Sequence, residues 1–101
     1  MIEPEMLVSI NVPPLLEEGV VDCLLAIAAV DRFNSAVVNA HGCDHEVMTL
    51  SEQVTGRQRQ VNFQVYLAES QVLNLINHLK TDFSGSGIQY WVSPVLDSGY
   101  I

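Results

Sequence analysis

Basic residues are scarce in this sequence. Its 101 residues include only four Lys and Arg against twelve Asp and Glu, so the formal net charge at pH 7 is −8. A charge of this sign repels the phosphates of nucleic acids and of anionic membrane surfaces. We therefore expect no nucleic-acid partner.

The sequence also has few cysteines and no long hydrophobic run. Cys23 and Cys43 are its only cysteines, too few for the disulfide framework of a small secreted domain. No window approaches the roughly 20 apolar residues that span a bilayer, and the first residues lack a basic n-region. We expect reduced thiols, a cytoplasmic location and no insertion into a membrane.

Hydrophobic residues make up 49% of the chain, enough for one modest core, so residues 1–101 are expected to form a single domain. Alternating apolar residues predict strands over 5–12, 33–40, 60–67 and 88–95. Helical spacing predicts one helix from Pro13-Pro14 to about Asp31 and a second over 69–83. This order predicts an α+β, ferredoxin-like βαββαβ fold, in which two helices cover one face of a four-stranded antiparallel sheet.

Two features of this predicted fold go beyond the core. The segment of about 42–59, between the second and third strands, is far longer than a hairpin needs, which is typical of a functional loop. The sheet face away from the helices is expected to carry Asn11, Asn62, Gln64 and Tyr66. Such a face is either solvated in a monomer or buried against other subunits, where amides and a phenol exchange hydrogen bonds.

Metal-ligating residues gather in the stretch NAHGCDHE, residues 39–46. If the second strand continues past Ala40, its two-residue period places His41, Cys43 and His45 on one face. Imidazole and thiolate donors suit zinc, copper or nickel, with Glu46, water or a neighbouring subunit as the fourth ligand. The alternative is a solvated polar loop without a ligand.

The sequence contains few residues in the patterns that catalytic sites need, and we expect no enzyme activity. A hydrolase of acyl phosphates with this element order needs an arginine after the first strand, where this chain has Val12-Pro13-Pro14-Leu15. No GxSxG elbow or CxxC pair marks a nucleophile. RNA-recognition modules need several aromatic residues and a basic surface on the sheet, whereas the outward positions of the third strand offer only Tyr66.

Several motifs nevertheless carry a family resemblance. The element order, the long loop, the glycine turn at 83–87 and the closing segment 91–99 resemble the PII-like signalling proteins, over nearly the whole chain. More narrowly, the stretches 51–57 and 61–65 are similar to an uncharacterised bacterial branch of that superfamily, which is related to nitrogen regulatory protein PII and to CutA.

The resemblance implies a non-enzymatic homotrimer whose sheets line the centre and whose clefts between subunits hold small effectors. It implies that the long loop reports ligand state to a partner protein, such as a membrane transporter or efflux system. The alternative is a metal-binding accessory protein linked to copper- or zinc-type tolerance. Gly85 and Gly87 would contact the effector, with Arg57 and Arg59 as phosphate contacts. Because Ile88-Gln89 and the tail lack cations, we expect adenine nucleotides to bind weakly or not at all.

Overall fold

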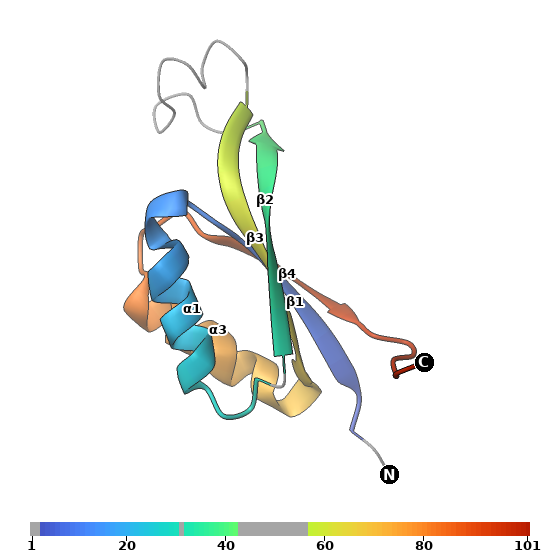
Figure 1. Ribbon diagram of the computed structural model, residues 1–101. Helices are drawn as coiled ribbons and strands as arrows, with labels where there is room; N and C mark the ends of the chain where they lie inside the picture. The colour runs from blue at the N-terminus through green and yellow to red at the C-terminus, as the bar shows by residue number, and fades with distance from the viewer. Residues whose placement is uncertain (1–2, 31, 43–56) are drawn as a thin grey trace.

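The structure, a computed structural model, describes residues 3–30, 32–42 and 57–101 (Figure 1). Its elements follow the order β1 (Glu5–Val12), α1 (Glu17–Ala26), β2 (Arg32–His41), β3 (Arg57–Ala68), α3 (Val72–Asp82) and β4 (Gln89–Pro94). A short 3₁₀ turn precedes each helix, η1 (Pro14–Leu16) before α1 and η3 (Glu69–Gln71) before α3. The predicted α+β, ferredoxin-like βαββαβ order is confirmed.

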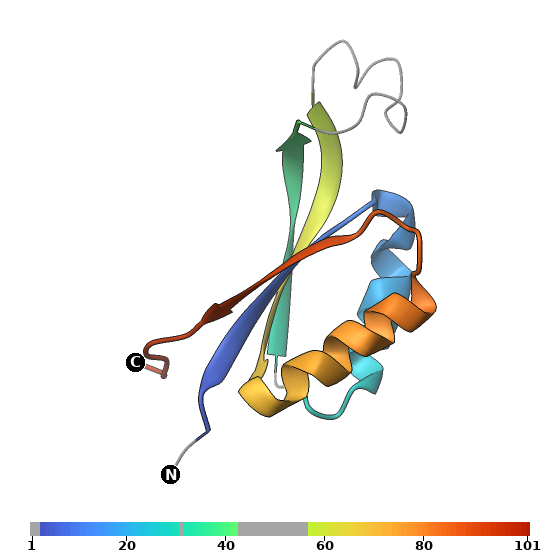
Figure 2. The same cartoon turned by 180° about the vertical axis from the view of Figure 1, so that it is seen from behind.

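The four strands form one antiparallel sheet in the order β2-β3-β1-β4, and both helices lie against the same face (Figures 1 and 2). The two central strands, β1 and β3, pair so that Ile10 stands opposite Phe63. The side chains of these two residues are fully buried on the helix side. The core of this layer consists of Val8, Ile10, Val12, Val61, Phe63, Val65 and Leu67.

The helices close the core from the other side. Pro13 and Pro14 end the β1 ladder and start η1, since the fixed φ of proline suits a first helical turn. The buried helical residues are Val20, Leu24, Leu75, Ile76 and Leu79. Gly19 allows a close approach between the helices, because a Cβ there would lie 3.2 Å from a ring carbon of Phe83.

Helix α1 ends at Ala26, earlier than predicted. Ile27 has an extended backbone, with φ −88° and ψ 108°, while its N–H still donates to the Leu24 carbonyl. Ile27 remains buried, so its side chain fits the helical spacing even though its backbone has left the helix. Side-chain spacing alone therefore overestimated the length of this helix.

Strands β2 and β3 extend further than their hydrophobic alternation indicated. The register runs from Arg32 opposite Tyr66 to His41 opposite Arg57. Backbone pairing thus continues through the polar residues 57–59, which the sequence reading assigned to the loop. β2 ends where Gly42 takes a φ of +76°, a conformation that glycine adopts without steric cost. Residues 43–56 of the predicted loop lie outside the described residues.

Replacing Phe63 with alanine tests the position of the core. Because the Phe63 ring is fully buried between the sheet and the helices, we expect the Phe63→Ala variant to lose about 3–5 kcal/mol of unfolding free energy. Urea denaturation followed by circular dichroism measures this loss. Leu15→Ala is the matched control, since Leu15 is 98% exposed and its truncation should change little. Equal losses in both variants would contradict this placement of the core.

Candidate functional site

A pocket lies where α3 leads through the glycine turn into β4. The Phe83 N–H donates to the Leu79 carbonyl at 2.9 Å, and the Ser86 N–H donates to the Phe83 carbonyl at 3.1 Å. Gly85 and Gly87 then take φ values of +74° and +82°, a region that L side chains rarely adopt. These two glycines therefore allow the chain to reverse tightly at the end of the helix.

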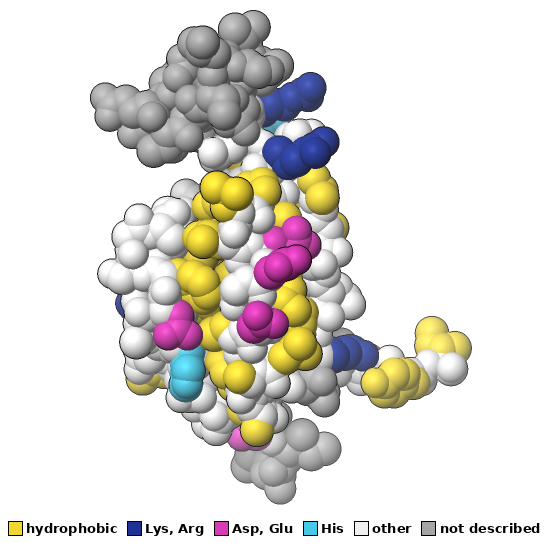
Figure 3. All heavy atoms as spheres, turned by 60° about the vertical axis from the view of Figure 1, so that its left-hand side comes forward, with side chains coloured by type: hydrophobic (Ala, Val, Ile, Leu, Met, Phe, Trp, Pro, Cys, Tyr) yellow, Lys and Arg dark blue, Asp and Glu magenta, His cyan; other side chains and the backbone are white. Residues whose placement is uncertain are grey.

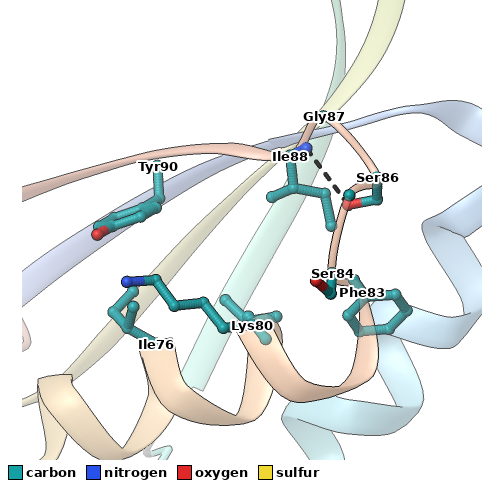
Figure 4. A pocket seen from close by; sticks show the side chains of 10 residues that line it. Ile76, Lys80, Phe83, Ser84, Ser86, Gly87, Ile88 and Tyr90 are labelled. Carbon is teal, nitrogen blue, oxygen red and sulfur yellow. Dashed lines mark hydrogen bonds between the residues drawn. The ribbon is translucent and has the colours of Figure 1, made fainter.

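The pocket has a volume of about 290 Å³. Its walls combine apolar side chains with the polar turn, and Figure 4 shows Lys80 extending toward the ring of Tyr90 across this space. The Ile88 N–H donates to Ser86 Oγ at 3.4 Å, which closes the turn at the rim. The lining residues are Ile76, Leu79, Lys80, Phe83, Ser84, Gly85, Ser86, Gly87, Ile88 and Tyr90.

Lys80 is a candidate site residue that the sequence pattern did not indicate. The helical pattern assigned it to the outward face of the second helix, and it is exposed, yet it lines this pocket. It is also the only lysine of the chain. Two signals pointed to it: Lys80 follows Ile76 by one helical turn, and it stands in the last turn before the glycines. Its ammonium supplies three hydrogen-bond donors and lies on the Tyr90 side of the pocket (Figure 4).

The structure brings together only part of the predicted effector site. Gly85 and Gly87 line the pocket, as the resemblance implied. Arg57 and Arg59 lie in β3, opposite His41 and Asn39 of β2, and do not line it. A role for the two arginines in binding phosphate therefore stays a prediction.

The centre of the sheet face away from the helices carries the predicted polar residues, with Leu7 and Trp91 beside them on the same face. Asn11 pairs with Asn62, so these residues share this face with Gln64 and Tyr66. The Asn62 amide donates from Nδ2 to Asn11 Oδ1 at 2.8 Å and to Ser9 Oγ at 2.9 Å. These side-chain bonds link β1 to β3 across the sheet, so the face is ordered by its own amides.

The same face carries two further features that the sequence did not indicate. The guanidinium of Arg32 lies 4.9 Å from the ring centroid of Tyr66 and 5.7 Å from that of Tyr100, which holds the tail against the sheet. Gln60 is only 7% exposed, and its Nε2 donates to Gln58 Oε1 at 3.2 Å. Its own Oε1 has no hydrogen-bond partner among the described residues.

Of the predicted metal ligands, only His41 belongs to the described residues; Cys43, His45 and Glu46 lie outside them. His41 is the exposed last residue of β2. Within residues 3–30, 32–42 and 57–101, no three His, Cys, Asp or Glu side chains gather into a possible metal site. The metal site at His41, Cys43, His45 and Glu46 stays a prediction.

His78 and Cys23 are the other histidine and cysteine among the described residues. His78 is exposed on α3, with its Nδ1 2.9 Å from the Asn74 carbonyl oxygen one turn earlier. Cys23 is partly buried on α1, and this burial, together with the neighbouring carboxylate of Asp82, raises the pKa of its thiol. The Cys23 thiol therefore stays protonated at neutral pH, which is typical of an unreactive thiol.

The chain is similar to a protein family and to several solved structures. A family model described as protein of unknown function (DUF3240) matches residues 3–101. No curated protein matches the sequence. Within the described part of the chain, none of the helices combines the length and the apolar character needed to cross a membrane.

Solved structures share the fold at low sequence identity. A DUF3240 family protein from Shewanella baltica has 15% identity, a TM-score of 0.81 and 99% coverage of both chains. The PII-like protein CPII from Thiomonas intermedia, bound to ADP, AMP and bicarbonate, has 16% identity, a TM-score of 0.73 and 97% coverage of both chains. Arabidopsis thaliana PII bound to citrate has 18% identity and a TM-score of 0.69, with 92% of this chain and 78% of that chain covered.

Metal titration tests the predicted ligand set. We expect zinc or copper to bind the wild-type chain more tightly than a His41→Ala, Cys43→Ser, His45→Ala variant, because imidazole and thiolate are the donors removed. Isothermal calorimetry measures both affinities, and binding should weaken as the pH falls and these donors take up protons. Equal affinities for the two chains would exclude this site and, with it, the metal-accessory alternative.

Proposed function

Because the chain belongs to the DUF3240 family and shares the fold of PII-like signalling proteins, we propose that it is a non-enzymatic regulatory protein that binds a small effector and signals to a partner protein. The observation that carries the proposal is the glycine-turn pocket. Its apolar walls, single ammonium and two serine hydroxyls provide binding groups. Among the described residues that line the pocket, no hydrogen bond pairs Ser84 or Ser86 with Lys80, the nucleophile–base contact that covalent catalysis would need.

The chemistry of the pocket favours a small anion with an apolar or planar part. Among the described residues, Lys80 is the only cation that lines it, so a ligand with one or two negative charges is balanced better than a triphosphate. The net charge of −8 adds a further cost for a highly charged anion. Among solved structures of this fold, CPII is bound to ADP, AMP and bicarbonate, and Arabidopsis PII to citrate. Of these ligands, bicarbonate and AMP have the low charge that a single ammonium balances best.

We also propose that the working form is a homotrimer with the polar sheet face at its centre. The network of Asn62, Asn11 and Ser9 already satisfies several polar groups of this face. The neutral amides at the centre of this face can be buried at a lower desolvation cost than charged groups, which supports assembly through this side.

Replacing Lys80 tests the effector pocket. Calorimetry with bicarbonate, citrate, AMP, ADP and ATP should show that at least one of the smaller anions binds more tightly than ATP. A Lys80→Gln variant should weaken this binding about tenfold, because it removes one charge-assisted hydrogen bond. Lys80→Arg is the matched control, since it keeps one positive charge at the same position and should retain most of the affinity. Micromolar ATP affinity that survives the Lys80→Gln change would contradict the proposed site and direct attention to Arg57 and Arg59.

A charge on the sheet face tests the homotrimer. Light scattering at micromolar concentration should give a trimer mass for the wild-type chain and a lower mass for Gln64→Glu, since the new carboxylate would be desolvated at the interface. Asn77→Glu is the control, because Asn77 is exposed on α3 and the same charge there should leave the mass unchanged. A monomer mass for the wild-type chain would refute the trimer.

A further inference from the structure

Helix α1 presents exposed leucines on the side that faces away from the core. Leu15, in the η1 turn before the helix, is 98% exposed, and Leu25 in its last turn is 69% exposed. Glu18 and Asp22 stand between them, so the four positions follow spacings of three, four and three residues. Such spacings place side chains along one stripe of a helix.

This stripe is separate from the surface that α1 packs on the sheet. The buried residues of the helix and its end are Val20, Leu24 and Ile27, which lie on the opposite side of the helical wheel. Beside the stripe, a hollow of about 280 Å³ is lined by Glu17, Glu18, Val21 and Asp22. Figure 3 shows acidic side chains among hydrophobic ones on this face of the molecule.

The charge of this surface has a single sign. No Lys, Arg or His occurs among the first 31 residues, so α1 and its flanking segments contain no cation that could pair with Glu17, Glu18 or Asp22. Leucines exposed to water beside unneutralised carboxylates form a surface that is complementary to a basic, amphipathic segment.

We propose that Leu15, Glu18, Val21, Asp22 and Leu25 form a docking surface for a basic amphipathic segment of a partner protein. Apolar residues of that segment would cover Leu15 and Leu25, while its Lys or Arg side chains would pair with Glu18 and Asp22. The charge excludes two other occupants: a second copy of the same face carries the same negative charge, and an anionic membrane repels it.

This inference names the chemistry of the partner and so rests on the signalling part of the proposed function. It uses a different surface from the glycine-turn pocket and from the polar sheet face. Effector binding and trimer formation are therefore measured independently of it, and the failure of one leaves the others standing.

Peptide titration tests the docking surface. The probe is a fluorescein-labelled synthetic helix of Leu and Lys at amphipathic spacing, and its binding to the full chain is followed by fluorescence anisotropy. We expect Leu15→Ser with Leu25→Ser to weaken binding on the order of tenfold, because the apolar contact is lost. Glu18→Lys with Asp22→Lys should weaken it as well and should reduce its dependence on salt.

Two controls separate docking from general stickiness. Leu73 on α3 is 69% exposed, as Leu25 is, so Leu73→Ser removes the same exposed side chain elsewhere and should leave the affinity unchanged. A peptide of Ser and Lys with the same charge should bind at least tenfold more weakly to the wild-type chain. The proposal is overturned if no peptide binds, if Leu73→Ser weakens binding as much as the Leu15 and Leu25 changes, or if both peptides bind equally.

Discussion

The pairing of β1 with β3 at the centre of the sheet determines both faces of the molecule. With Ile10 opposite Phe63 and Asn11 opposite Asn62, one register buries the hydrophobic residues under the helices and gathers the amides on the other side. A slip by one residue would exchange the two sets and place Asn62 in the core. Burial of the Phe63 ring strongly disfavours that slip, so the same constraint fixes the core and the polar face.

The three proposed functional surfaces depend on this sheet in different ways. Helix α3 packs on it through Leu75, Ile76 and Leu79, and this packing positions the turn whose glycines border the pocket. The polar face is a direct product of the strand register. Val20 and Leu24 form the buried side of α1, so the stripe on the opposite side of the helix is left exposed. Effector, subunit and partner can therefore occupy separate surfaces of one small domain.

Much of this fold could be predicted from the sequence, because the central strands alternate strictly and are buried on one side only. Residues 60–67 have this pattern, and they do form the middle of β3. Polar ends were harder to place: the pairing of Arg57 and Arg59 with β2 is set by backbone hydrogen bonds, which leave no hydrophobic signal. The end of α1 was predicted too late because Ile27 is buried at helical spacing, and a buried side chain does not require a helical backbone.

The site was predicted only in part. The positive φ of Gly85 and Gly87 follows from glycine chemistry and was accessible to sequence reasoning. The place of Lys80 depends on how the end of α3 meets β4, a tertiary contact that no local pattern encodes. The hydrogen bond between Asn62 and Asn11 depends on the register of β3 and β1. The alternation of apolar residues placed these two amides on the same face of the sheet.

The glycine turn is the place where we propose that an effector binds. The most direct measurement is the amide NMR spectrum of the ¹⁵N-labelled chain, recorded as bicarbonate or AMP is added. We expect the shifted signals to cluster at residues 84–88 and at Lys80, next to the pocket. Shifts confined to other parts of the chain, or no shifts with either anion, would contradict this proposal.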